Sequence, residues 1–310
     1  MSEQDGTYFL VDGSIYIFQS HFSPYVECFD VDGNDLSAVY GFTQFLMQFL
    51  RRVKPDRIAV ALDESLFSGF RHDLCPNYKS NRELPDENLA MQLKACREIC
   101  SILGMASYAS EKYEADDIIG TLSVRMSELL PGDPALCIVS RDKDLAQLLR
   151  SDRDYMWDYS GNKRRYRADI EKEFGVSPEQ FPDYLGLVGD SVDCITGVPG
   201  VGPVKAKELL RNFTTMDGIY ANLDAVAALP LRGAAGLAAK LQAHQADAVL
   251  SRNLATIICD ASDRHEGFAN AVASSLELSE VDISSLEKFL SRYNFTADDS
   301  DHLLSSAQRF

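Results

Sequence analysis

Nine carboxylates occur at positions where a folded chain could gather them. They follow short apolar runs, begin a helix, or precede a glycine-rich segment: Asp12, Asp63, Glu114, Asp116, Asp117, Asp142, Asp144, Asp190 and Asp193. Two unit charges about 4 Å apart repel by about 4 kcal/mol at an effective dielectric near 20, so such a group requires cations. Oxygen ligands without nearby His or Cys favour Mg²⁺ or Mn²⁺ over zinc. Two such ions suit phosphodiester hydrolysis.

Each of these acids taken alone is explained as a solvated loop residue or a helix cap. The three acids at 114–117 begin a helical pattern, where the helix dipole favours one or two carboxylates. The metal hypothesis therefore depends on the whole group converging.

A glycine-rich segment follows two of the acids. In 184–210, YLGLVGDSVDCITGVPGVGPVKAKELL, Gly197, Gly200 and Gly202 come shortly after Asp190 and Asp193. Glycines let backbone N–H groups approach a phosphate, and the N-terminus of a following helix adds a favourable dipole. An ordinary tight turn between helices would also explain the glycines, but the neighbouring acids favour phosphate.

The elements that must position these residues alternate in type along the first half of the chain. Apolar runs at 7–11, 57–62 and 135–139 predict strands that each lead into acids, and 105–109 predicts a weaker strand. Helical patterns at 37–53 and 88–103 separate them. This predicts an α/β fold with a central, mostly parallel sheet flanked by helices. Ligands of such sheets bind beyond the carboxyl ends of the strands, where the acids fall.

The second half of the chain is predicted to be helical. Ser177, Pro178 and Gln180 indicate a capped helix start, and 221–258 reads as Ala- and Leu-rich helix. The tail from 261 holds nine acids against four bases. We therefore divide the chain into an α/β core at 1–172 and a helical region at 173–310 that ends in an acidic helical tail.

Composition limits the function classes. The chain is 45% hydrophobic with a net charge of −17, which argues against a general nucleic-acid binder. No apolar run approaches the ~20 residues of a membrane span, and no signal peptide is expected. Seven scattered cysteines favour packing roles in a reducing cytoplasm, so we expect a cytoplasmic protein.

Six motifs in order carry a resemblance to a known family. FLVDGS, ALDES, FRHDLCPNYKSNRELP, YEADDIIGTL, SRDKDLAQLL and GDSVDCITGVPGVGPVKAKELL resemble the motifs of bacterial 5′–3′ exonucleases, within the flap endonuclease superfamily. These include the N-terminal nuclease domain of DNA polymerase I and its stand-alone relatives, and the length fits a stand-alone version. The resemblance implies a PIN-like or resolvase-like core with a helical arch at about 66–90 and a helix-three-turn-helix motif (a helix-hairpin-helix) at about 184–213.

The resemblance also implies roles for the acids and the metals. Asp12, Asp63, Glu114 and Asp116 look like the ligands of a first metal ion, and Asp142, Asp144 and Asp190 like those of a second, with Asp116 between the two; Asp117 and Asp193 match further family acids that act through water. It implies two Mg²⁺ ions, for which Mn²⁺ substitutes, and a K⁺ ion at the hairpin.

The implied DNA contacts lie in two segments. In the arch, Lys79 and Arg82 match basic residues at the scissile phosphate, where cations would stabilise the transition state; Arg71 and Tyr78 accompany them, and Tyr78 could stack on a base. A solvated basic loop is the simpler alternative. In the hairpin, the implied contacts are Gly197, Val198, Gly200, Val201, Gly202, Lys205 and Lys207, extended by Arg211.

Two departures from the family pattern stand out. Relatives often have lysine where Val204 stands, and a small residue where Arg141 precedes Asp142. The expected function is a structure-specific 5′ nuclease that cuts DNA at 5′ ends or flaps in repair or replication, leaves 5′-phosphates and acts as a monomer. The alternatives are a non-catalytic DNA-structure binder and a PIN-type RNA nuclease, which usually lacks the arch and the hairpin.

Overall fold

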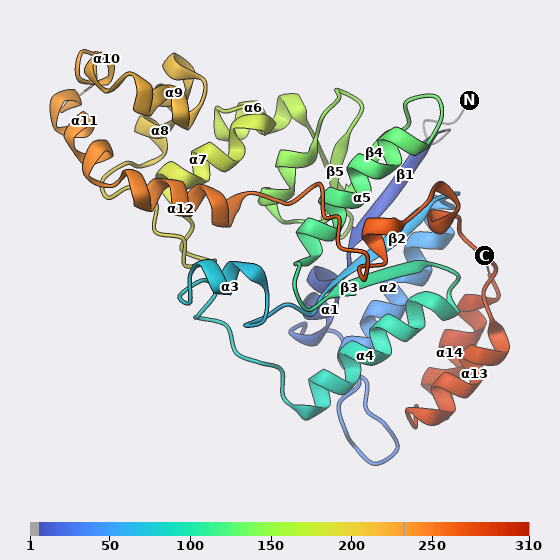
Figure 1. Ribbon diagram of the computed structural model, residues 1–310. Coiled ribbons are helices and arrows are strands. Elements are labelled where there is room, and N and C mark those ends of the chain that lie inside the picture. The colour runs from blue at the N-terminus through green and yellow to red at the C-terminus, as the bar shows by residue number, and fades with distance from the viewer. Residues whose placement is uncertain (1–5, 232, 310) are drawn as a thin grey trace. The chain divides into compact units, whose positions relative to one another are not determined.

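The structure is a computed structural model that describes residues 6–231 and 233–309 (Figure 1). These residues form two compact units. Unit 1 combines the described residues up to Ser65 with Leu84–Arg141 and those from Ile258 onward. Unit 2 combines Leu66–Glu83 with Asp142–Ile257. Each unit is therefore built from separate stretches of the chain.

The strands form a mostly parallel sheet, as the sequence predicts. Their bounds are β1 (Thr7–Asp12), β2 (Ile58–Asp63), β3 (Ala106–Ser110), β4 (Ala135–Val139), β5 (Tyr155–Asp158) and β6 (Lys163–Tyr166), in the order β3-β2-β1-β4-β5-β6. The four strands of unit 1 are parallel, with Val11 opposite Val60 and Val139. In unit 2, β5 and β6 form an antiparallel hairpin. The apolar runs become strands because a sheet covered on both faces buries every side chain, and β1 is buried throughout.

Helices of unit 1 cover this sheet. They are α1 (Gly13–His21), α2 (Ser37–Val53), α4 (Glu87–Ile102), α5 (Ala115–Leu129), α13 (Ile283–Arg292) and α14 (Ala297–Ala307), with short 3-10 turns at Phe268–Asn270 and Ala273–Leu276. The α2 bounds match the prediction because its apolar stripe has a clear helical period. Phe49 of α2 meets Phe9 of β1 edge-on, with ring centroids 5.7 Å apart.

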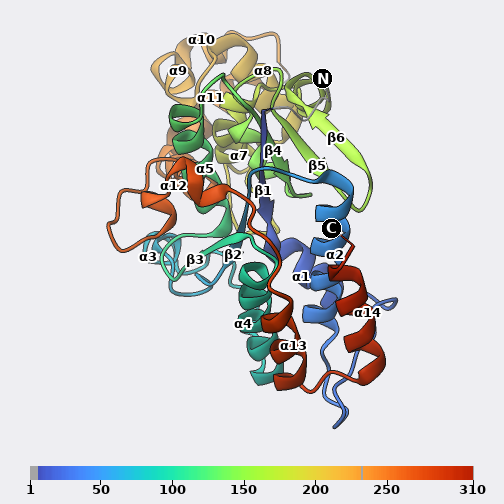
Figure 2. The same cartoon turned by 90° about the vertical axis from the view of Figure 1, so that its right-hand side faces the viewer.

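The acidic tail contributes to the core of unit 1. Leu286, Phe289 and Leu290 of α13 and Leu303 of α14 are buried. Figure 2 shows α13 beside α4 and α14 beside α2, and both pairs are in contact. Apolar burial of this kind gives roughly 1.5–3 kcal/mol for each large side chain. The charged residues of the tail therefore lie on helices whose other face is packed.

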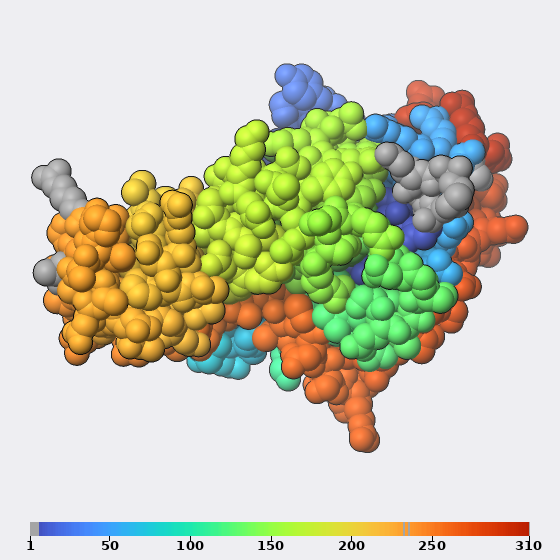
Figure 3. All heavy atoms as spheres, turned by 90° about the horizontal axis from the view of Figure 1, so that it is seen from above, coloured from blue at the N-terminus to red at the C-terminus, as the bar shows by residue number. Residues whose placement is uncertain are grey.

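Unit 2 is mainly helical. Its helices are α3 (Phe70–Leu74), α6 (Arg167–Phe174), α7 (Phe181–Val188), α8 (Pro203–Phe213), α9 (Met216–Ala221), α10 (Leu223–Ala227), α11 (Ala234–Ala243) and α12 (Gln245–Ala255), with 3-10 turns at Lys143–Leu148 and Pro178–Gln180. The capping box predicted for Ser177 and Gln180 is present. In the space-filling view of Figure 3, the gold and orange atoms of α8 to α11 form a continuous surface.

The predicted helix over 221–258 is instead three separate helices, α10, α11 and α12. Pro230 and Gly233 lie in the first break, and Gly233 has a φ of 78°, a left-handed conformation that ends a helix. α12 packs closely on α7, because a side chain in place of Gly186 would come within 2.9 Å of the Cβ of Arg252. The division of the chain at 172/173 stays a prediction.

Candidate active site

Asp12 lies at the carboxyl edge of the parallel strands. It is the last residue of β1 and only 4% exposed. The hydroxyl of Ser140, the residue after β4, donates a hydrogen bond to its carboxylate at 2.9 Å. The backbone N–H of Ile15 also donates to it, at 3.4 Å, so Asp12 caps α1. The carboxylate is thus held at the sheet edge where the sequence predicts it.

Asp63 lies on the neighbouring strand at the same edge. Asp12 is paired with Ala61, so Asp63 extends two residues further along β2. Ser65 donates to the Asp63 carboxylate from its backbone N–H at 3.1 Å and from its hydroxyl at 2.8 Å. The backbone N–H of Asp63 donates to the hydroxyl of Ser14 at 2.8 Å. Adjacent parallel strands therefore deliver two carboxylates side by side.

The three acids at the start of α5 have different roles. Glu114 is the N-cap and is buried. Asp117 is fully buried, and its two oxygens accept hydrogen bonds from the backbone N–H groups of Glu114 at 3.1 Å and Ile258 at 2.8 Å. This corrects its prediction as a metal ligand, because backbone donors already occupy both oxygens. Glu114 and Asp116 remain candidates.

A second acidic group lies in unit 2 around Lys143. Asp142 caps the 3-10 turn by accepting from the N–H of Asp144 at 2.9 Å. The Lys143 ammonium lies 2.5 Å from Oδ2 of Asp190 and 3.1 Å from Oδ1 of Asp144. A hydrogen bond at 2.8 Å from the N–H of Val192 further fixes Asp190. Three of the predicted ligands are therefore close to one lysine.

The electrostatics of this group reflect crowding of like charges. Burial, and then the nearby charge of Asp142, raise the pKa of Asp144 to about 7, against the opposing effect of Lys143. Burial also acts to raise the pKa of Asp190, but hydrogen bonds from Lys143 and Val192 hold that pKa below its ordinary value. Desolvation tends to lower the pKa of Lys143, yet Asp144 and Asp190 hold it above its ordinary value. The carboxylates thus need a cation nearby.

Asp193 pairs with the basic residues of the arch. Its carboxylate accepts from the Arg82 guanidinium at 2.8 Å and lies 4.0 Å from the Lys79 ammonium. The backbone N–H of Lys79 also donates to the carbonyl of Asp193 at 3.1 Å, and the amide of Asn81 donates to the carbonyl of Val192. In this conformation Asp193 therefore anchors the arch, which corrects its placement among the metal ligands.

Two arch residues differ from their predicted roles. Arg71 is 3% exposed, and its guanidinium donates to the carbonyls of Leu254 at 2.8 Å and Thr256 at 2.7 Å, at the end of α12. Tyr78 is 2% exposed and its ring meets His72 edge-on. Buried side chains are not available to DNA, so in this structure Arg71 ties the base of the arch to α12 and Tyr78 packs beneath it.

The glycine hairpin has the backbone geometry that its sequence requires. Gly197 and Gly200 have φ angles of 65° and 80°. Val198 and Val201 are buried at 3% and 4% exposure, so only their backbone could reach a phosphate. Gly202 is the N-cap of α8. The hairpin thus presents backbone rather than side chains.

Three lysines lie around this hairpin. The Lys205 ammonium donates to the carbonyl of Gly200 at 2.9 Å. Lys240 of α11 lies over Gly200, where a Cβ would come within 2.9 Å of its ammonium. Lys207 instead lies over Gly175, at the end of α6. Sequence reasoning missed Lys240 because it follows Gly200 by 40 residues with no motif around it. Val204 is 78% exposed.

The donor set fits a divalent cation that prefers oxygen. Across 6–231 and 233–309, no three Asp, Glu, His or Cys side chains already stand close enough to share an ion. Carboxylates that repel one another separate or pair with a cationic side chain, as Asp144 and Asp190 do with Lys143. The raised pKa of Asp144 is the signature of a site that a bound cation would relieve.

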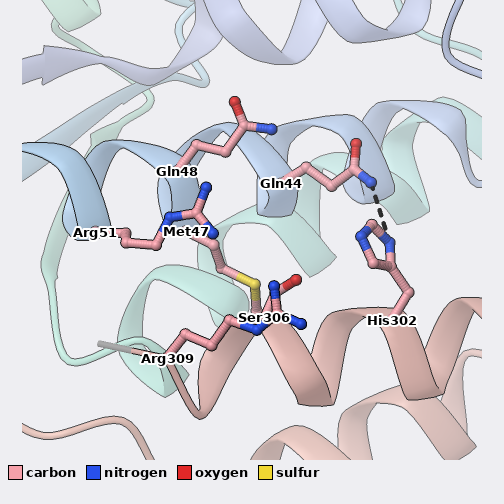
Figure 4. Close-up of a pocket in the computed structure, with 7 residues that line it drawn as sticks. All are labelled: Gln44, Met47, Gln48, Arg51, His302, Ser306 and Arg309. Carbon is pink, nitrogen blue, oxygen red and sulfur yellow. Dashed lines mark hydrogen bonds between the residues drawn. The ribbon is translucent and has the colours of Figure 1, made fainter.

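A cavity of about 120 Å³ lies elsewhere, between α2 and α14 (Figure 4). None of the predicted site residues lines it; its walls are Gln44, Met47, Gln48, Arg51, His302, Ser306 and Arg309. His302 is held there by the hydroxyl of Tyr40 at 3.0 Å and by Gln44 at 3.4 Å. None of the helices described is long and apolar enough to cross a membrane.

The fold is that of known 5′ nucleases. A structure of T5 5′-exonuclease with zinc bound covers 97% of this chain and 98% of its own, with a TM-score of 0.63 and 18% identity. The catalytic core of Rad2 in complex with DNA substrate covers 98% and 92%, with a TM-score of 0.60 and 17% identity. At these identities the likeness shows the fold alone.

Sequence comparison defines the family. Models of the 5′-3′ exonuclease N-terminal resolvase-like domain and C-terminal SAM fold match residues 7–175 and 176–272. The 5′-3′ exonuclease of Buchnera aphidicola (subsp. Schizaphis graminum) is 30% identical over 286 residues, 92% of this chain and 96% of that protein. DNA polymerase I of Pseudomonas aeruginosa is 36% identical over 81% of this chain but only 27% of that protein. The chain belongs to the 5′-3′ exonuclease family, a group of DNA-binding nucleases.

Proposed function

We propose that this chain is a structure-specific 5′ nuclease, a 5′–3′ exonuclease or flap endonuclease, which hydrolyses DNA phosphodiesters in repair or replication and leaves 5′-phosphate products. The observation that carries the proposal is the pair of carboxylates, Asp12 and Asp63, on adjacent parallel strand ends. Relatives solved with divalent metals and with DNA substrate support it. An α/β sheet with this edge chemistry binds its ligand there.

The proposed metal ligands form two sets, one in each unit. Asp12, Asp63, Glu114 and Asp116 would hold one Mg²⁺, and Asp142, Asp144 and Asp190 a second, with Mn²⁺ able to replace either. Bound divalent cations would activate water and neutralise phosphoryl charge. Ser140 and Ser65 fix the directions of Asp12 and Asp63 through their hydroxyls.

Lys79 and Arg82 are the proposed residues that stabilise charge on the phosphoryl oxygens. Both are paired with Asp193, so they must exchange that carboxylate for the substrate phosphate. A cation aimed at developing negative charge typically supplies a few kcal/mol of transition-state stabilisation. The ion pair keeps both side chains ready without exposing Lys79, which is 6% exposed.

The hairpin is proposed to hold the duplex part of the substrate. Backbone of Gly197, Gly200 and Gly202 would face phosphates, assisted by Lys205 and by Lys240 over Gly200. A K⁺ ion would bridge this backbone to a phosphate, as the family resemblance implies. Binding should weaken as salt rises, because phosphate contacts release counterions. We propose that the enzyme acts as a monomer in the cytoplasm, where its DNA substrate would lie.

The test is cleavage mapping on matched 5′-flap, nicked, blunt and single-stranded DNA. With Mg²⁺, labelled product should appear from the 5′ end or flap, and EDTA or Asp116→Ala should reduce it by orders of magnitude. Asp224→Ala, which removes an exposed acid of α10, is the matched control and should retain activity. Equal rates for all samples would overturn the metal-site proposal. Flap retention without cleavage would identify a DNA-structure binder instead, and preferential RNA cleavage a PIN-type nuclease.

A further inference from the structure

Lys143 occupies a particular place in the second acidic group. Its ammonium lies 2.5 Å from Asp190 and 3.1 Å from Asp144, and the side chains of these two acids are 7% and 11% exposed. The lysine side chain itself is 38% exposed, so it reaches the buried carboxylates from the solvent side. One cationic side chain thus bridges two of the three acids proposed to bind the second metal ion.

We propose that Lys143 is an internal counter-ion of this group, and that a divalent cation can bind Asp144 and Asp190 together only after displacing the Lys143 ammonium. The proposal rests on the proposed metal-binding role of these acids. It concerns a residue that no metal-ligand set includes, because an ammonium cannot itself coordinate a metal ion.

Charge balance explains why such a counter-ion is needed. Asp142, Asp144 and Asp190 bring three carboxylates together, and Lys143 supplies one positive charge to them. A buried carboxylate without a compensating charge costs several kcal/mol. The ammonium therefore stabilises the protein before metal arrives, but a divalent ion neutralises more charge and accepts more oxygen ligands.

The geometry also makes the displacement feasible. Lysine carries its charge on a flexible stem with four rotatable carbons, and more than a third of this side chain is already in contact with solvent. Removing it breaks two ion pairs without moving the backbone of the 3-10 turn. Metal binding to this group must then overcome the lost ion pairs, whereas Asp12 and Asp63 are held by serine hydroxyls. The group around Lys143 should accordingly fill at higher metal concentration than the other.

The experiment measures metal binding rather than activity. Mn²⁺ is titrated calorimetrically into the full, DNA-free chain at about pH 8, where carboxylates are ionised, and the thermal midpoint is recorded with and without metal. The variants are Lys143→Met, Lys143→Gln and the control Lys172→Met. Lys172 is an exposed lysine of α6, so its loss changes net charge equally without touching the acids.

We expect Lys143→Met to tighten the weaker Mn²⁺-binding step by about tenfold or more, equivalent to about 1.4 kcal/mol, and to lower the metal-free midpoint, which metal should restore. Lys172→Met should change neither. Lys143→Gln provides the same comparison in a polar background if the methionine variant does not fold. Affinity that is unchanged or weakened in both Lys143 variants would overturn the counter-ion role. Absence of Mn²⁺ binding in the wild-type chain would instead overturn the proposed metal site.

Discussion

Replacing Gly197 with alanine tests the backbone geometry of the hairpin. Gly197 has a φ of 65°, in the left-handed region that side chains avoid. A Cβ built there would lie 2.4 Å from the backbone nitrogen of Gly189 and 2.6 Å from the carbonyl carbon of Val188. These neighbours are backbone atoms, so no side-chain rotation can relieve the overlap. The substitution must displace the hairpin from α7.

The magnitude follows from two contributions. A left-handed conformation costs roughly 1–2 kcal/mol for a non-glycine residue, and overpacking a well-packed site costs roughly 1–3 kcal/mol. The shift would also disturb the hydrogen bonds from Gly197 N–H to the Ser251 hydroxyl at 3.0 Å and from Val198 N–H to the Leu187 carbonyl at 2.8 Å. We expect a loss of about 2–5 kcal/mol in the free energy of unfolding unit 2.

The assay is urea unfolding of Gly197→Ala and Gly202→Ala, followed by duplex-DNA binding. Gly202 has a φ of −95° and no atom within 4 Å of a modelling-free Cβ position, so alanine there should change stability by less than about 1 kcal/mol. Gly197→Ala should also weaken duplex binding, because the backbone that faces phosphate has moved. Equal stability of the two variants would refute the close-approach reasoning.

Two further predictions concern buried charges. Arg71→Gln should lower the free energy of unfolding by about 2–4 kcal/mol, because it removes the charged donor to the carbonyls of Leu254 and Thr256; chemical denaturation checks this, and an unchanged midpoint would contradict it. The pKa of Asp144, raised to about 7, predicts that its protonated form stabilises the metal-free fold at low pH and that this contribution is lost as pH rises through about 7. Mg²⁺ affinity should rise over the same interval, with proton release near pH 6 but not near pH 8 in calorimetry with two buffers. Asp144→Asn should abolish the release.

Much of the sheet and its edge could be predicted from the sequence. The bounds of α2 and the parallel pairing of β1 with β2 follow from short apolar runs separated by helical periods. Asp12 and Asp63 then lie together by topology, since parallel neighbours end at one edge. These features depend on local pattern and on a general rule of α/β folds.

The roles of individual polar residues could not be predicted in this way. Arg71 reads as an exposed arch cation, but its burial depends on carbonyls 183 and 185 residues further along the chain. Asp117 is distinguished from Asp116 only by the N–H of Ile258, 141 residues away. Lys143 lies within a motif of acids, and only the fold brings Asp190 to it. Such contacts are long-range, so no local periodicity encodes them.

The interleaved make-up of the two units has a consequence for synthesis on the ribosome. Unit 1 uses both the first and the last described stretches, whereas unit 2 is complete once Ile257 has emerged. The sheet of unit 1 must therefore wait, with its strands made but α13 and α14 still missing, until the end of translation. Domains commonly fold in order from the N-terminus. Here the later-starting unit can finish first, and the strand ends that carry Asp12 and Asp63 acquire their full packing last.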